Sequence, residues 1–437
     1  MKMSKKILAL LLAVVMVVAM VALSACSEKK TEDGENDKDK TTEKAKGETE
    51  SLLPAPEIEK FDVPADFKIG VICLHDENST YDNNFIRAIN NVKTALGLTD
   101  EQVIVKVNIP ESSECKDAAN ELAAGGCKIV FADSFGHEEH MIEAAKANPD
   151  VQFCHATGVR AHTEGLDNYH NAFASIYEGR YLAGIAAGLK INEMIDGGKI
   201  TADQAIMGYV GAFTYAEVIS GLTSFYLGAK SVCPSVTMKV RYTGSWYDPD
   251  AEQEAANALI QTDKCVLISQ HADSLGAPSA CEAAGVPDVS YNGSTIAAGE
   301  NTFIISSAIN WEPYFAYIIK QVVDGKKIDT DWTGTIATGS VVLSGLNSAV
   351  AAEGTKEAID KAIAGFKDGS LKVYDINTFT VDGKKLDETH KPGEGTDSAF
   401  AEGTVIVSDG YFHESEYRSA PYFDIRIDGI EFLNEKY

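Results

Sequence analysis

From Phe67 onward, short apolar runs alternate with polar loops and alanine-rich segments. The run KIGVIC leads into LHDENSTYDNN and then into FIRAINNVKTAL, and KIVFA, AIMGYVGA, MKVRYT and CVLISQ begin the same succession. Runs of this length are typical of buried strands, and the alanine-rich segments are typical of helices. Repeated strand–helix alternation predicts an α/β fold whose parallel sheets carry helices on both faces. The helix-like segment at 176–195 separates two such series, so we expect two similar lobes.

The N-terminus has the pattern of an export signal. Three lysines within the first six residues precede an unbroken apolar run at 7–23, which ends in the sequence LSAC at Cys26. A basic start followed by a short apolar core is typical of secretion. Small residues before a cysteine resemble the cleavage site of bacterial lipoproteins, so we expect a signal peptide at 1–25 and lipid on Cys26. The alternative is a single transmembrane anchor, because seventeen apolar residues just span a bilayer.

The segment after Cys26 is polar throughout. Residues 27–50 contain no aromatic residue and no aliphatic residue larger than alanine, and their charges have both signs. Such a stretch cannot bury enough apolar surface to fold. We therefore expect a lipid-anchored disordered tether at 26–65, with a tail of no function as the alternative.

Charge and cysteine content narrow the choice of partners. The 437 residues include 38 Lys and Arg against 65 Asp and Glu, a formal net charge of −27. This balance argues against binding to nucleic acid or docking on anionic lipid through a basic patch. Besides Cys26, seven cysteines stand mostly in apolar surroundings and form no CxxC pair, so we expect buried free thiols.

The loops between strands and helices are rich in aromatic and hydrogen-bonding side chains. Open parallel sheets bind ligands beyond the carboxyl ends of their strands, where these loops lie. They hold His75, Asp76, Asn78, Tyr81, Asn83, Phe85, Asp133, Ser134, Phe135, Phe213, Trp246, Asp248, Gln270, His271 and Asp273. Flat aromatic rings stack, and Asp, Asn and Gln form hydrogen bonds, so the set suits a planar heterocycle with or without a ribose. The near absence of Lys and Arg from these loops disfavours a strongly anionic ligand.

Motifs for enzymatic and metal chemistry are missing or incomplete. There is no GxSxG elbow, no GxxxxGK[ST] loop and no GxGxxG after a strand. His137-Glu138-Glu139-His140 is not the zincin pattern HExxH, and a solvated helix start explains it. We expect no catalytic residue, metal or cofactor. A nucleoside hydrolase is the weakest alternative, with Asp76, Asp133 and Asp273 as its acidic cluster.

Five ordered blocks match a known family. They are ADSFGHEEHMIEAAKANPDVQFCHATG, IYEGRYLAGIAAG, GSWYDPDAEQEAANALI, SQHADS and SSAINWEPYF. In these blocks, and from about Phe67 to about Asn377, the chain resembles the basic membrane protein (BMP) family of lipoproteins, which is related to purine nucleoside receptors. The resemblance implies a type I periplasmic-binding-protein fold and an ABC permease as partner. We expect lobe 1 at 66–175, lobe 2 and a crossover at 176–305, a return to lobe 1 at 306–377, and a C-terminal extension of unknown role at 378–437.

The resemblance also implies roles for single residues. Asp76 and Phe85 stand nine positions apart as in the nucleoside receptors, so Phe85 would stack on a base and Asp76 would bond to the ligand. Asp133, Ser134 and Phe135 match a loop of lobe 1, and Phe213 falls where a second stacking aromatic is expected. Two positions depart from the family pattern: Asn292 replaces an acid and Asn310, followed by Trp311, replaces a lysine.

The predicted ligand-binding residues come from the loop chemistry and from the resemblance together. They are Asp76, Tyr81, Phe85, Asp133, Ser134, Phe135, Phe213, Trp246, Asp248, Gln270, His271, Asp273, Asn292, Asn310 and Trp311. The ligand is expected to be a purine nucleoside or, with Trp246 or Trp311 stacking on it, a free nucleobase; flavins stay open. We expect a monomeric binding lipoprotein on the outer face of a Gram-positive cell membrane that delivers ligand to a permease. A lipoprotein that senses ligand for signalling is the alternative.

The lipid attachment can be tested directly. The change Cys26→Ala removes the thiol that would carry the lipid, so we expect loss of label from a radioactive fatty acid. The protein should then appear in the medium or as an uncleaved precursor. Undiminished labelling of the variant would exclude Cys26 as the lipid site.

Overall fold

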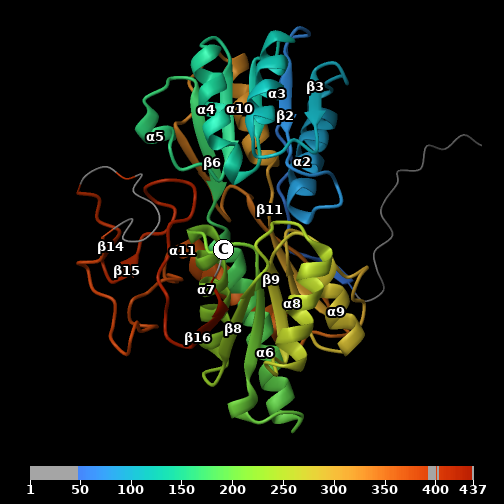
Figure 1. Cartoon of the computed structure of the whole chain (residues 1–437), viewed down its shortest axis with the longest axis vertical. Helices are drawn as coiled ribbons and strands as arrows, with labels where there is room; N and C mark the ends of the chain where they lie inside the picture. The colour runs from blue at the N-terminus through green and yellow to red at the C-terminus, as the bar shows by residue number, and fades with distance from the viewer. Residues whose placement is uncertain (1–47, 392–399, 401–402, 436–437) are drawn as a thin grey trace, which may run out of the picture. The chain divides into compact units, whose positions relative to one another are not determined.

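The computed structural model describes residues 48–391, 400 and 403–435 (Figure 1). The predicted signal peptide at 1–25 and the predicted lipid site Cys26 lie outside these residues. Within the described ranges, no helix combines the length and the apolar character needed to cross a bilayer.

Lobe 1 is built on a sheet of six strands that all run parallel, as predicted. In sheet order β12-β6-β5-β4-β2-β3 they span Asp331–Gly334, Tyr169–Ala174, Gln152–Ala156, Ile129–Ala132, Ile69–Ile72 and Val103–Lys106. Its helices are α2 (Thr80–Leu96), α3 (Ser113–Ala124), α4 (Glu138–Ala147), α5 (Ala161–Glu164) and α10 (Glu312–Val323), with the 3₁₀ turn η1 (Phe135–His137) before α4. Most of these strands are buried on both faces, which explains their continuous apolar runs.

Lobe 2 is built on a sheet of eight strands in the order β1-β13-β11-β10-β9-β7-β8-β16. They span Glu48–Leu53, Val341–Asn347, Phe303–Ile309, Asp288–Tyr291, Leu267–His271, Ile206–Gly211, Thr237–Tyr242 and Ile430–Asn434. The helices are α6 (Ile176–Asp196), α7 (Ala216–Val232), α8 (Pro249–Gln261), α9 (Gly276–Ala284) and α11 (Thr355–Asp368), with the 3₁₀ turn η2 (Ala202–Gln204). The sheet is parallel except at β13, which runs antiparallel to both β1 and β11.

The chain returns to lobe 1 for a shorter stretch than the sequence predicts. After β11 it enters lobe 1 as α10 and β12, and it then crosses back, because β13 pairs with β11 in the lobe 2 sheet. Helix α11 packs on α6 of the same lobe. The prediction that 306–377 lies in lobe 1 is therefore wrong for β13 and α11. In the sheet, β13 lies between β11 and β1, and this pairing places it in lobe 2.

An N-terminal strand changes the predicted tether. Glu48–Leu53 forms β1, which pairs antiparallel with β13 at the edge of the lobe 2 sheet. Leu53 is buried against that sheet. The prediction of a disordered tether at 26–65 is therefore wrong for 48–53. Leu52 and Leu53 supply an apolar anchor there, whereas residues 27–50 contain none.

Glycines bring helices α6 and α7 unusually close together. A Cβ atom on Gly184 would lie 2.1 Å from the carbonyl oxygen of Phe225, and one on Gly228 would lie 2.0 Å from that of Tyr181. Neither backbone can yield, so any side chain at these positions would push the helices apart. The IYEGRYLAGIAAG block thus fixes α7, whose first turn reaches the cleft between the lobes.

The seven cysteines of the described chain are free and buried, which confirms the prediction from their apolar surroundings. Burial also raises the pKa of Cys154 to about 12, so its thiol stays protonated at neutral pH. These residues act as small core side chains.

The C-terminal extension begins after helix α11, and its last strand forms one edge of the lobe 2 sheet. Strands β14 (Val407–Ser408) and β15 (Tyr411–Phe412) form a small hairpin. The last strand, β16, pairs in parallel with β8. Figure 1 shows this red segment alongside both lobes. The sequence left the role of 378–437 open, and the structure integrates its described part into the fold.

A buried acid gives the fold a specific pH dependence. Asp288 is fully buried at the start of β10, where its carboxyl accepts hydrogen bonds from Ser290 and Thr295. Burial raises the pKa of this carboxyl to about 7. In the unfolded chain an Asp ionises near pH 4. The native state therefore binds one more proton between these values, and its free energy of unfolding falls as the pH rises through this window.

The change Asp288→Asn should remove this dependence. Relative to the variant, the wild-type protein should lose stability by up to ~1.4 kcal/mol per pH unit between about pH 4 and pH 7. Urea denaturation of both proteins at pH 5, 6, 7 and 8 measures the difference. Asp250→Asn, on the exposed start of α8, is the matched substitution of an exposed acid. A pH-independent difference for Asp288→Asn would contradict a buried neutral carboxyl.

Candidate functional site

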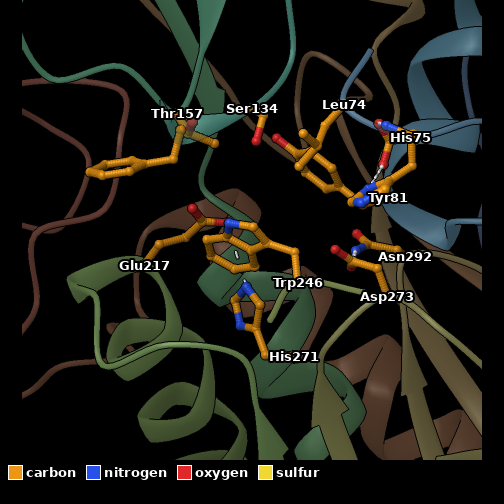
Figure 2. A pocket seen from close by; sticks show the side chains of 12 residues that line it. Leu74, His75, Tyr81, Ser134, Thr157, Glu217, Trp246, His271, Asp273 and Asn292 are labelled. Carbon is orange, nitrogen blue, oxygen red and sulfur yellow. Dashed lines mark hydrogen bonds and ion pairs between the residues drawn. The ribbon is translucent and has the colours of Figure 1, made fainter. Parts of the chain in front are cut away.

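A pocket lies between the carboxyl ends of the two parallel sheets (Figure 2). It encloses about 360 Å³ of empty space, its mouth included. Lobe 1 lines it with Leu74, His75, Tyr81, Asp82, Ser134, Phe135 and Thr157, and lobe 2 lines it with Glu217, Trp246, His271, Asp273 and Asn292. Each of these residues ends or follows a strand or opens the next helix, as expected for ligand sites at such edges.

The two lobes touch at both ends of the pocket. At one end the backbone N–H of Thr80, in the first turn of α2, donates to the carbonyl oxygen of Asp273 at 2.9 Å. At the other end the rings of Phe135 and Tyr215 stack, with centroids 5.0 Å apart. The structure is therefore that of a closed cleft, held by contacts that opening would break.

Two wall residues have a strained backbone. Thr157 follows β5 with φ of 65°, and Asn292 follows β10 with φ of 66°. Asparagine tolerates this left-handed region, whereas a β-branched threonine is rare there. Strain of this kind costs about 1–3 kcal/mol and gathers at functional sites. The turn at each strand end thus aims these side chains into the cleft.

An aromatic surface forms one side of the pocket. Trp246 projects into its centre, above His271 and between Glu217 and Asp273 (Figure 2). The indole is half-buried and contacts Phe213, with ring centroids 5.1 Å apart. Phe213 itself stacks on Tyr215. The lobe 2 loops thus supply a supported flat face on which a planar ring can stack.

Lobe 1 contributes a buried pair of carboxyls. Although burial alone would raise the pKa of Asp82, hydrogen bonds from His75 and Ser79 lower it. Burial and the neighbouring charge of Asp82 raise the pKa of Asp133 well above its usual range. Together with Cys73 these groups come within 4.8 Å of one another, the spacing of a possible metal site. A protonated Asp133 beside an ionised Asp82 accounts for the cluster without a metal ion.

Lobe 2 places further acids around the ring of Trp246. The side-chain amide of Asn292 donates to Asp273 at 3.0 Å, and burial raises the pKa of Asp273 well above its usual range. Nε2 of His271 lies 3.4 Å from Oε1 of Glu217. Burial lowers the pKa of His271, which favours the neutral imidazole.

The donors of the pocket are mostly used by the protein itself. The hydroxyl of Tyr81 donates to the carbonyl of Asp133, that of Ser134 to Glu111, and that of Thr157 to the carbonyl of Ala156. No Lys or Arg stands among the residues that line this pocket. The polar groups that the walls offer to a ligand are chiefly the carboxyl groups of Glu217 and Asp273, and a protonated Asp273 can donate as well as accept a hydrogen bond.

Seven of the predicted site residues line the pocket: Tyr81, Ser134, Phe135, Trp246, His271, Asp273 and Asn292. Five lining residues were missing from the prediction: Leu74, His75, Asp82, Thr157 and Glu217. His75 stands among the loop residues of the sequence analysis, and Thr157 is the last residue but one of a block that carries the resemblance. Glu217 had no comparable signal, because an acid in the first turn of a helix is common for electrostatic reasons.

Two predicted aromatics belong to the core instead. Phe85 is fully buried and stacks on Trp311, which is 1% exposed, with ring centroids 4.4 Å apart. Neither residue lines the pocket, so the predicted stacking of Phe85 or Trp311 on a ligand is wrong for this cleft. Phe85 lies one helical turn after Tyr81 and packs against its ring at 4.9 Å. Tyr81 therefore occupies the lining position that the spacing assigned to Phe85.

Other predicted residues shape the loops rather than the pocket surface. Asp76 closes a turn with Asn78, and Asp248 caps the N-terminus of α8. The side-chain amide of Gln270 donates to the carbonyls of Ala272 and Ser274. Asp248 and Gln270 thus hold the loops that carry Trp246 and Asp273.

The remaining three predicted residues are also supports. The side-chain amide of Asn310 donates to the carbonyl of Gly339 at 3.1 Å. This bond joins the segment between β11 and α10 to the segment between β12 and β13, both of which cross between the lobes. Asp133 accepts from the N–H of Leu74 behind the pocket wall. Phe213 backs Trp246, as described above.

The sequence His137-Glu138-Glu139-His140 does not converge on one point. His137 is buried and bonds to the carbonyl of Ile109, while Glu138 accepts from the N–H groups of Val159 and Arg160. These contacts join α4 to neighbouring loops of lobe 1, which is a structural role.

The comparisons with known proteins agree with this geometry. A family model described as ABC transporter substrate-binding protein PnrA-like matches residues 75–370. A purine-binding protein of Brucella abortus is 32% identical over 337 residues, which cover 76% of this chain and 88% of the relative. A protein of Haloferax volcanii named as an ABC transporter glucose-binding protein is 34% identical over 223 residues, 51% of this chain and 53% of its own length.

Solved structures show the same fold. An ABC transporter solute-binding protein from Conexibacter woesei aligns with a TM-score of 0.56 at 20% identity, covering 70% of this chain and 98% of that one. This likeness bears on the fold alone and confirms the predicted two-lobed type I architecture. Because the family model matches well over half of the chain, the chain belongs to the BMP family of PnrA-like substrate-binding proteins of ABC transporters, a family of binding proteins rather than enzymes.

Proposed function

We propose that this protein binds a purine nucleoside or nucleobase in the closed cleft and delivers it to an ABC permease. The observation that carries the proposal is the flat indole face of Trp246 inside a pocket whose walls carry the carboxyl groups of Glu217 and Asp273 and no Lys or Arg. A purine ring stacks on such a face and presents N–H groups at its edges. The purine-binding relative from Brucella abortus supports the same ligand class.

The charged groups of the pocket narrow the choice of ligand further. Glu217 and Asp273 accept hydrogen bonds, and the lining residues include no Lys or Arg to hold a phosphate. Purines with amino groups and ring N–H donors match this set, whereas nucleotides place a charged phosphate among carboxyls. The uncharged base or nucleoside is therefore the favoured cargo.

Transport requires that binding and lobe closure are coupled. A ligand held between Trp246 and the lobe 1 wall contacts both lobes only when the cleft is closed, so it stabilises that form by its differential affinity. The closed, loaded protein then docks on its permease. The family works on the extracellular or periplasmic side. Attachment there through lipid on Cys26, as a monomer, is part of the proposal.

A sugar is the second candidate ligand. The relative from Haloferax volcanii is named as a glucose-binding protein. An aromatic face flanked by carboxyls also suits a sugar, whose hydroxyls donate to acids and whose C–H face packs on a ring. Titration with glucose therefore accompanies the purine experiments.

The choice between base and nucleoside follows from two asparagines. Asn292 and Asn310 replace an acid and a lysine of the nucleoside receptors, and Asn310 is bound to Gly339. We expect preference for nucleosides below about a hundredfold, near 2.7 kcal/mol, when adenosine is compared with adenine and guanosine with guanine by calorimetry. A larger preference would mean that the acids of the cleft hold a ribose unaided. Binding of glucose but of no purine would overturn the proposal.

The stacking role of Trp246 has its own test. Trp246→Ala should weaken binding of the best purine by about 1–3 kcal/mol, the scale of a lost base–aromatic stack. Phe85→Leu is the matched control: it lies in the adjacent core, so it should lower the melting temperature but leave the affinity within about threefold, under ~0.7 kcal/mol. Calorimetry and thermal melting of both variants decide. Wild-type affinity in Trp246→Ala would remove the indole from the site.

A further inference from the structure

A second chamber adjoins the pocket at one end. It encloses about 900 Å³ of empty space, its mouth included, against about 360 Å³ for the inner pocket. Phe135, Thr157 and Glu217 line both spaces, so these three side chains stand between them. Figure 2 places Thr157 and Glu217 together at one end of the pocket, opposite His75 and Asn292. The outer chamber thus continues the cleft beyond the end at which Phe135 stacks on Tyr215.

The C-terminal extension builds the far wall of this chamber. Arg418, Ala420 and Pro421 face the two lobes across it. The family model ends at residue 370, so this wall lies outside the matched region. The extension therefore adds a surface to the cleft that the family match does not include.

The wall is attached to both lobes. On lobe 1, the N–H of Ser419 donates to Asp331 at 2.6 Å, and the hydroxyl of Thr333 donates to the carbonyl of Ser415 at 3.2 Å. Both partners lie on β12. On lobe 2, β16 joins the sheet beside β8. Attachment at both ends makes the wall a fixed part of the closed cleft.

The packing of residue 423 secures the wall to α7 as well. Phe423 stacks on Tyr374 with ring centroids 4.2 Å apart, and the Tyr374 hydroxyl donates to the carbonyl of Ser220 on α7. Helix α7 also carries Ala216 and Glu217 at its start, on the opposite side of the chamber. The contacts from Phe423 through Tyr374 to α7 thus set the distance between the extension and the start of α7 across the chamber.

The surface of the chamber is mainly apolar. Phe135, Tyr215, Val159, Ala216 and Pro421 give it ring faces and aliphatic groups. Arg418 donates from Nε to the carbonyl of Ala420 and from Nη2 to that of Pro421, and its guanidinium lies over the ring of Tyr422. Glu217 also lines the chamber, and its carboxyl group disfavours an anion such as phosphate there.

We propose that the outer chamber is a second subsite of the cleft, which takes an uncharged, largely apolar substituent on the purine held by Trp246. This inference rests on the proposed function and deepens it: the ligand class becomes a substituted purine rather than a bare base. The C-terminal extension then acts as a determinant of specificity.

The experiment compares adenine with two adenines that carry a benzyl group, one on the exocyclic nitrogen and one on N9. At least one benzyl compound should bind the wild-type protein as tightly as adenine or more tightly. Ala216→Trp fills the chamber from α7, and Ala420→Trp fills it from the extension. Each should weaken the benzyl compound tenfold or more while adenine stays within threefold. Val405→Trp, at an exposed position of the extension, is the matched control and should change neither affinity.

The outcomes separate the two proposals. Adenine binding without binding of either benzyl compound overturns the chamber and leaves the function standing. Equal losses for adenine and benzyl compound in Ala216→Trp also overturn it. Failure of these three compounds on the wild-type protein, together with failure of adenosine, guanine and guanosine, overturns the proposed function and the chamber with it. Ala216 is half-buried, so this variant keeps the test valid if the buried Ala420→Trp does not fold.

Discussion

The contact between the first turn of α2 and the carbonyl of Asp273 sets the closed position of the two lobes. The N–H and the hydroxyl of Thr80 both donate to that oxygen. The first N–H groups of a helix have no partner within it, so a carbonyl from the opposite lobe satisfies one of them and meets the positive end of the helix dipole. Opening the cleft returns both groups to water. Together with the stacking of Phe135 on Tyr215, this bond joins the two lobes at the ends of the pocket.

Acidic groups dominate the interior of the cleft, and their burial limits what can fill it. Asp82, Asp133 and Asp273 lie near one another, and the raised pKa values of Asp133 and Asp273 show that two of them resist ionisation. A ligand that donates hydrogen bonds relieves this excess of acceptors, whereas an anion adds to it. The same electrostatics that keep nucleic acid away from the surface of this acidic protein thus act inside its binding site.

The C-terminal extension gives the cleft an additional wall. Its strand β16 is held by the lobe 2 sheet, and its middle part bonds to β12 of lobe 1. A segment bonded to both lobes moves with their closure or restrains it. Any motion of one lobe relative to the other therefore involves the part of the chain that the family match does not cover.

Local sequence patterns determined the layered α/β fold, the two lobes and the edge at which the site forms. Apolar runs followed by polar loops report strand ends, and parallel topology brings strand ends to one edge. The tertiary structure alone decided which side chains line the pocket. Tyr81 and Phe85 are both aromatic and one helical turn apart, yet the rotation of α2 puts the first in the pocket and the second in the core. Glu217 and the wall at Ala420 enter the site because α7 and the extension pack across from lobe 1, and contacts so distant along the chain leave no local pattern in the sequence.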